Sequence, residues 1–251
     1  MMGRKTKHKS QHNYLSERVV GILRAKPKGK VLDLGCGSGE SSLKLAELGF
    51  QVTGADMDVG RFKYHDRLSF VPCDLKDPLN IPPGTYDYVI FLEVIEHIYN
   101  PGMVMAEISR VLKPGGRLII STPNVSNIGS RLRFLFEGSF DFFREPLVEF
   151  SRTGREALQN VHVIPWRYNE LEFLLFRHGL EVCGVFSDSN GRAFSKIAGM
   201  MLKPFLTFQA WIKERRSLRK GGADYRRMNR ILLSDALLYG RHMILEAEKK
   251  V

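Results

Sequence analysis

The segment VLDLGCGSGE, residues 31–40, decides the fold because it joins a buried strand, a glycine turn and the first turn of a helix. The apolar run at residues 30–34 has the length of a strand. Residues 40–48 repeat apolar side chains at helical spacing and end before Gly49. A strand, a glycine turn and a helix in this order present backbone N–H groups to a nucleotide. The segment therefore predicts a nucleotide-type cofactor site at the end of the first strand.

The spacing of the glycines narrows the choice of cofactor. A dinucleotide fingerprint would place glycines at positions 35, 37 and 40, but position 40 is Glu. A Glu side chain prevents the close helix–strand packing that the third glycine allows. No Gly-Lys-Ser/Thr sequence follows, so the turn is not a Walker loop for a nucleoside triphosphate. NAD, FAD and nucleoside triphosphates are therefore disfavoured.

The rest of the chain alternates between strand and helix patterns. Further strands are expected at residues 50–56, 68–74, 86–92, 117–122, 180–186 and 242–248, and helices at 13–25, 101–112 and 169–179. Strands that read as apolar on both faces and alternate with helices indicate a parallel, doubly wound sheet. The predicted fold class is therefore α/β.

The length and amino-acid composition of the chain are typical of a folded protein. Its 251 residues are 43% hydrophobic and 26% charged, and no run of about 18 apolar residues predicts a spanning helix. No apolar stretch follows the basic start, so we expect no secretory signal. The three cysteines are far apart and lack metal-ligand spacing. This usage fits a reducing compartment, so we expect a cytoplasmic protein.

The net charge of +11 is unevenly distributed along the chain. Residues 1–30 carry +8 and residues 201–251 carry +7, whereas the segment between them carries −4. Basic flanks of this kind suit an anionic lipid surface, a phosphate-bearing substrate or a nucleic acid. They are equally explained by a need for solubility alone.

The glycine turn and four later features together resemble one enzyme family. Asp33 with Gly35, Gly37 and Gly39 resembles motif I of the class I S-adenosylmethionine (SAM) dependent methyltransferases, and Asp56 and Asp74 close the next two strands as the family's acids do. FLEVIEH (91–97) and LKPGGRL (112–118) resemble the family's segments around the fourth and fifth strands. The resemblance implies a Rossmann-like, doubly wound, mostly parallel seven-stranded sheet with its last strand antiparallel. We expect it over residues 28–251, after a basic N-terminal helical arm at 1–27.

The resemblance also assigns the cofactor-binding positions. Asp56 is expected to bind both ribose hydroxyls and Asp74 to face the adenine amino group. Met57 would pack on the adenine or be an ordinary core residue. Asp33 would orient the turn or the SAM amino group, or only cap the turn. The full set of cofactor-binding residues that it implies is Asp33, Gly35, Cys36, Gly37, Gly39, Asp56, Met57, Asp74, Leu75 and Glu93.

Candidate catalytic residues follow the fourth strand, at the switch point where ligands bind in such sheets. His97 has a side chain suited to a general base. The spacing Glu93-x-x-Glu96-His97 also resembles ubiquinone-biosynthesis-type O-methyltransferases, some of which are thought to place a divalent metal there. A third reading is that these residues only cap the next helix. We predict His97, Glu96 and His162 as catalytic residues. His162 is included because the resemblance implies that a His of this segment faces the acceptor. Whether a metal is bound is left undecided. The alternative is that His162 is a loop histidine that only forms a hydrogen bond with the backbone.

Two insertions interrupt the alternation. Residues 123–165 hold six of the sixteen Phe and are expected to form a lid over the acceptor. Residues 189–235 form an apolar and then basic helical segment, and Pro204 is expected to divide its first part, 189–220, into two short helices. An apolar body with a basic end fits the interface of an anionic membrane. The alternatives are packing over the acceptor pocket and a dimer contact.

These observations predict a SAM-dependent methyltransferase whose acceptor is an oxygen of a small or lipid-linked molecule. The protein would be cytoplasmic, with residues 189–220 as the segment that reaches a membrane. One alternative is an RNA methyltransferase that uses the basic flanks, although the chain has no RNA-binding module and no Asn-Pro-Pro-Tyr/Phe sequence. Another is a SAM-binding protein without catalysis. The sequence leaves the acceptor and the oligomeric state open.

Overall fold

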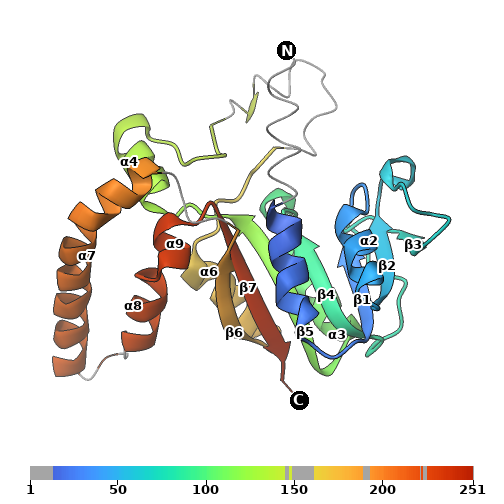
Figure 1. The fold of residues 1–251 in the computed structure, drawn as a ribbon. Coiled ribbons are helices and arrows are strands. Elements are labelled where there is room, and N and C mark those ends of the chain that lie inside the picture. The colour runs from blue at the N-terminus through green and yellow to red at the C-terminus, as the bar shows by residue number, and fades with distance from the viewer. Residues whose placement is uncertain are drawn as a thin grey trace, which may run out of the picture.

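A seven-stranded sheet lies at the centre of the molecule, with the strand order β3-β2-β1-β4-β5-β7-β6 (Figure 1). The computed structural model describes residues 14–144, 147–148, 161–188, 193–220, 222 and 225–250. β7 runs antiparallel to both of its neighbours, and the other pairs are parallel. The strands are β1 (Lys30–Leu34), β2 (Gln51–Asp56), β3 (Ser69–Pro72), β4 (Tyr86–Leu92), β5 (Leu112–Pro123), β6 (Leu180–Ser187) and β7 (His242–Lys249). The predicted fold class and the antiparallel last strand are confirmed.

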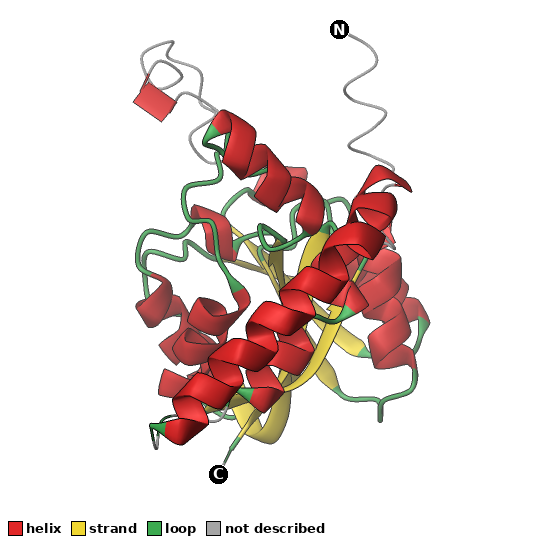
Figure 2. Ribbon diagram, turned by 90° about the vertical axis from the view of Figure 1, so that its left-hand side faces the viewer, coloured by secondary structure: helices red, strands yellow, loops and turns green. Residues whose placement is uncertain are grey.

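Helices cover both faces of this sheet, as Figures 1 and 2 show. One helix spans residues 14–24. The others are α2 (Glu40–Glu47), α3 (Pro101–Val111), α4 (Ile128–Glu137), α6 (Tyr168–Arg177), α7 (Ala193–Arg219), α8 (Arg226–Leu232) and α9 (Asp235–Tyr239), with short 3-10 turns η1 (Val59–Arg61) and η2 (Ile95–His97). Among the described residues, none of these helices has the length and apolar character needed to cross a membrane.

Successive residues of each strand belong to different core layers. Val31 packs with the helix at 14–24 and α2, whereas its neighbour Leu32 packs with α3 and α6. The same alternation relates Ile119 to Ile120 in β5. Side chains that alternate between two buried faces are what a doubly wound sheet requires, and they explain the continuous apolar runs in the sequence.

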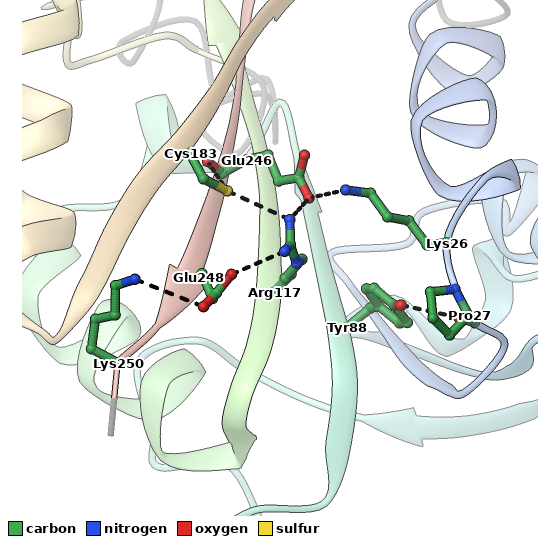
Figure 3. Close-up of polar contacts among 8 residues, drawn as sticks. All are labelled: Lys26, Pro27, Tyr88, Arg117, Cys183, Glu246, Glu248 and Lys250. Atoms are coloured by element: carbon green, nitrogen blue, oxygen red, sulfur yellow. Dashed lines mark hydrogen bonds and ion pairs between the residues drawn. The ribbon is translucent and has the colours of Figure 1, made fainter.

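A network of ion pairs connects the N-terminal helix to β5 and β7 (Figure 3). Lys26 Nζ lies 2.7 Å from Glu246 Oε1, and Arg117 Nη1 lies 2.6 Å from the same oxygen. Arg117 Nη2 also pairs with Glu248, at 2.9 Å. Residues 14–24 thus form part of the layer on one face of the sheet. Residues 1–13 of the expected arm lie outside the described residues.

The two insertions differ in how much of them the structure describes. The expectation that Pro204 divides its segment is wrong, because α7 continues through this proline as one helix. Pro204 lies on the exposed side of α7, so water can take the place of its missing N–H at the preceding turn. The expected lid contains α4, but its residues 145–146 and 149–160 lie outside the described part of the chain.

Candidate active site

The glycine turn between β1 and α2 has a backbone that only glycine adopts easily. Gly35, Gly37 and Gly39 have φ angles of 74°, 53° and 80°, in the left-handed region. A Cβ on Gly35 would lie 2.6 Å from Val94 Cγ2, and one on Gly39 would lie 2.4 Å from Phe62 Cε2. The missing side chains therefore let the turn pack closely against the segments that follow β2 and β4.

Asp56, the last residue of β2, joins the glycine turn to the next loop. Its Oδ2 accepts a hydrogen bond from Gly37 N at 2.8 Å, and its Oδ1 accepts one from Asp58 N at 3.0 Å. A carboxylate oxygen has two lone pairs, so each oxygen can still accept a hydrogen bond from a ligand hydroxyl. The side chain is thus held in a fixed direction beside the turn.

Asp33 is a buried residue that contacts the helix after the turn. Its Oδ2 accepts a 2.5 Å hydrogen bond from Ser42 Oγ in α2. Burial raises the pKa of Asp33 to about 7, although the Ser42 hydroxyl opposes the shift. This contact supports the reading in which Asp33 orients the glycine turn through the start of α2.

The other predicted cofactor residues from β1 to β3 lie around the same edge. Met57 is 49% exposed, so the alternative of an ordinary core methionine is wrong. Asp74 is partly exposed, and its Oδ1 accepts from Lys76 N at 3.0 Å. Leu75 is half-buried against the core. Cys36 is also half-buried, and burial together with the charges of Asp33 and Asp56 raises the pKa of its thiol.

Glu93, directly after β4, belongs to a buried polar network. It has a left-handed φ of 56°, and its Oε1 accepts from Ser121 Oγ at 2.8 Å. Its Oε2 lies 3.2 Å from His242 Nε2, and His242 Nδ1 lies 2.6 Å from Asp188 Oδ2. These residues come from the ends of four neighbouring strands, because antiparallel β7 begins at the edge where β4, β5 and β6 end.

The charge state of this network follows from its geometry. Burial by itself would lower the pKa of His242, but the charges of Glu93 and Asp188 outweigh burial and raise it. Burial would also raise the pKa of Asp188, but the hydrogen bond and charge of His242 hold it below its usual value. The two carboxylates thus favour the protonated form of His242 between them.

Glu96, His97 and His162 form a second cluster beside this network. The rings of His97 and His162 stack with centroids 4.9 Å apart, and His162 Nε2 lies 3.6 Å from Glu96 Oε1. The cluster is assembled by backbone bonds, since Val163 N and Ile164 N both donate to Glu96 O. The structure therefore brings the three predicted catalytic residues together.

Backbone carbonyls fix the tautomers of both histidines. His97 Nδ1 lies 2.9 Å from Val161 O, and His162 Nδ1 lies 3.0 Å from Phe142 O. A carbonyl oxygen only accepts, so each Nδ1 carries a proton and each neutral ring has its basic lone pair at Nε2. This arrangement suits both a general base and a metal ligand.

Glu96 is the buried acid of the cluster. Its side chain is inaccessible to solvent, and neither carboxyl oxygen makes a hydrogen bond of ordinary geometry within the described part of the structure. Burial and then the charge of Glu93 raise the pKa of Glu96 well above its usual range, against smaller opposing contributions from the backbone and Thr122. Burial and the charge of Glu93 therefore favour the neutral form of Glu96.

The same three residues could hold a divalent cation. One ligand atom from each of Glu96, His97 and His162 lies within 4.8 Å of the others. Two imidazoles and one carboxylate are a common ligand set, and a cation would hold the buried Glu96 deprotonated. Glu93 is a poorer ligand than its spacing indicates, because both its oxygens face Ser121 or His242. The capping alternative is wrong, since the side chain that caps α3 is Asn100.

Comparison with known proteins identifies the family to which the chain belongs. Residues 7–182 match the family described as methyltransferase domain, which is well over half of the chain. The chain belongs to this family. Among curated relatives, this methyltransferase is 29% identical over 178 residues to the ubiquinone biosynthesis O-methyltransferase of Photobacterium profundum, covering 63% of this chain and 74% of the relative. The protein of the same name from Xanthomonas campestris pv. campestris is 32% identical over 179 residues, covering 62% and 73%.

Solved structures agree on the fold. A SAM-dependent methyltransferase from Archaeoglobus fulgidus superposes with a TM-score of 0.55 and 19% identity, covering 93% of this chain and 94% of that one. This similarity shows that the two proteins share the fold. The family match and the glycine turn that resembles motif I make the protein a SAM-dependent methyltransferase.

Three residues at this methyltransferase site were missed by sequence reasoning. Asp188 directly follows β6, and His242 is the first residue of β7. Both residues therefore lie at the edge of the sheet that carries the site. A polar residue at each such end was the available signal. Arg61 also borders the glycine turn, with its Cζ 3.6 Å from the place of a Cβ on Gly37, and no motif points to it.

Proposed function

We propose that this methyltransferase transfers the methyl group of SAM to a hydroxyl oxygen. The glycine turn, Asp56, Met57 and Asp74 would hold the cofactor, with Asp56 accepting from the ribose hydroxyls. Arg61 supplies a positive charge for the carboxylate of the methionine part. Bound SAM supplies an electrophilic methyl group on a positively charged sulfur.

The observation that carries the proposal is the pair of histidines beside Glu96. A hydroxyl becomes a good nucleophile when a base removes its proton, and both rings place a basic Nε2 in the cluster. A neutral imidazole is a weak base, and a phenolic hydroxyl gives up its proton far more readily than an aliphatic one. The site thus favours a phenolic hydroxyl. The relatives named O-methyltransferases support oxygen as the acceptor atom.

A divalent cation is a second way to reach the same nucleophile. Held by Glu96, His97 and His162, it would lower the pKa of a hydroxyl bound to it. In that case His97 acts as a ligand, and the base is elsewhere. Chelation distinguishes the two, because only the metal form loses activity with chelator and regains it with added cation.

Methyl transfer from labelled SAM into a fractionated cell extract tests the acceptor class. The proposal expects label in the lipid or small-molecule fraction, and much less label at the same SAM concentration when Asp56→Ala protein is used. Label in the RNA fraction would contradict it and revive the alternative in which the basic flanks bind RNA.

A further inference from the structure

Helix α7 is 27 residues long, about 40 Å, and lies on the outside of the molecule. In Figure 2 it crosses the face turned to the viewer. Gly199 lies on the side of α7 that faces the protein, because a Cβ there would lie 2.3 Å from the ring of Tyr239 in α9. Asn229 Nδ2 also donates to Ala210 O, and Lys203 pairs with Asp235. One side of α7 is thus fixed to the body of the protein.

The opposite side of α7 carries large apolar residues where a solvated helix would carry polar ones. Successive members are three or four residues apart, and they are between 46% and 78% exposed: Ile197, Met201, Phe205, Phe208 and Trp211. This spacing places them along one stripe. A continuous exposed stripe of this size is unusual for a soluble surface and indicates an interaction.

The stripe continues as arginines. Arg215 and Arg219 follow Trp211 by four and eight residues and are exposed on the same side. The Arg215 guanidinium lies over the Trp211 ring, 4.3 Å from its centroid. Arg216 and Lys220 add exposed charge there, while the neighbouring acid Glu214 is half-buried and paired with Arg226. The outward surface of this end is therefore basic.

We propose that the outward side of α7 docks on an anionic lipid surface. Burial of the apolar stripe among acyl chains, with arginines and a tryptophan at the headgroup level, is the chemistry of an interfacial helix. A second copy packed in the same direction would bring like charges together at the arginine end, whereas anionic headgroups are complementary in charge to the arginines. The charge pattern thus favours anionic lipid as the occupant.

The first part of α7 lies beside α4, the helix that follows β5 (Figure 1). α4 also exposes two large apolar side chains, Leu135 and Phe136. The inference does not depend on which acceptor is methylated.

Co-sedimentation of the full chain with vesicles tests the proposal. Binding is expected with vesicles that contain phosphatidylglycerol, weak with phosphatidylcholine alone, and lower at high salt. Arg215→Glu with Arg219→Glu should lower binding roughly tenfold or more. A matched pair at exposed arginines elsewhere, Arg67→Glu with Arg177→Glu, should change it much less. Protein that stays in the supernatant with every vesicle would overturn the proposal.

A second pair of variants tests the apolar stripe. Phe208→Ser is expected to weaken vesicle binding, whereas Phe176→Ser, at an exposed aromatic residue of α6, should leave it unchanged. SAM binding should be the same in both variants, which shows that they are folded. Analytical ultracentrifugation without lipid measures the oligomeric state and so tests the alternative occupant, a second copy of the chain. A stable dimer that Phe208→Ser dissociates would overturn the lipid surface in favour of a second copy.

Discussion

His242 Nε2 lies 3.2 Å from Glu93 Oε2, which connects the start of the last strand to the residue that follows the fourth. Glu93 has a left-handed backbone that costs energy for a residue with a side chain. The contacts from His242 and Ser121 hold its carboxylate in this conformation, close to Glu96. Through Glu93, residues far apart in the sequence add to the effect of burial on the pKa of Glu96.

His242→Gln should destabilise the protein by about 3–5 kcal/mol, because Glu93 and Asp188 would lose their buried cation. The folded pKa of His242 is raised, so its stabilisation is fully present below the unfolded value of about 6.5 and is lost as pH rises through the folded pKa. Urea unfolding should therefore show a smaller wild-type advantage at pH 9 than at pH 6. An equal difference at both pH values, or a similar loss in the control His178→Gln, would contradict this account.

Glu246→Gln tests the ion pairs that dock the N-terminal helix. Burial would raise the pKa of Glu246, but hydrogen bonds from Lys26 and Arg117 outweigh it and lower the pKa. The stabilisation is present above the unfolded pKa of about 4.3 and is lost as pH falls through the folded value. At pH 7 we expect a loss of about 1.5–3 kcal/mol in unfolding free energy.

The control for this variant is Glu181→Gln, at an exposed partner of Lys250, which should change stability by less than about 1 kcal/mol. If Glu246→Gln keeps its full cost at pH 3, the ion-pair explanation fails.

Asp56→Ala should weaken SAM binding by about 1.5–3 kcal/mol, because the ligand loses hydrogen bonds to a charged acceptor. Calorimetric titration measures this loss directly. Asp66→Ala, at an exposed acid of the same region, should bind SAM like the wild type. Unchanged affinity in a folded Asp56→Ala protein would remove Asp56 from the cofactor site.

His97→Ala should lower kcat by roughly 10²–10⁴-fold while leaving SAM affinity nearly intact, if His97 is the general base. If it is instead a metal ligand, chelator should inhibit the wild type and added divalent cation should restore it. Steady-state kinetics with and without chelator separate the two roles. Normal turnover in the variant with no chelator effect would leave His97 a structural role only.

The fold was predictable from the sequence because its signals are local. Each strand is a short apolar run, and the glycine turn marks where the first one ends. One boundary was misplaced, since β5 begins at Leu112 and not at Arg117. The Lys-Pro-Gly-Gly segment joins the strand through an irregular register opposite Tyr86 and Tyr88. A bulge of this kind depends on the partner strand and leaves no pattern in its own residues.

The candidate site was predictable only in part. Glu96 and His97 lie next to a recognisable strand end, but Asp188 and His242 become neighbours of Glu93 only through the order of the strands in the sheet. The continuation of α7 through Pro204 also depends on tertiary structure, because the lost hydrogen bond falls on the exposed side of the helix. Local propensity cannot report which side of a helix faces water.

The atom that receives the methyl group tests the central claim most directly. The enzyme, SAM carrying a ¹³C-methyl group and the extract fraction that takes up label would be combined, and the product examined by carbon NMR. A ¹³C signal in the methoxy range, absent with His97→Ala protein, is the predicted result. A methyl group attached to nitrogen or carbon would contradict O-methylation by this site.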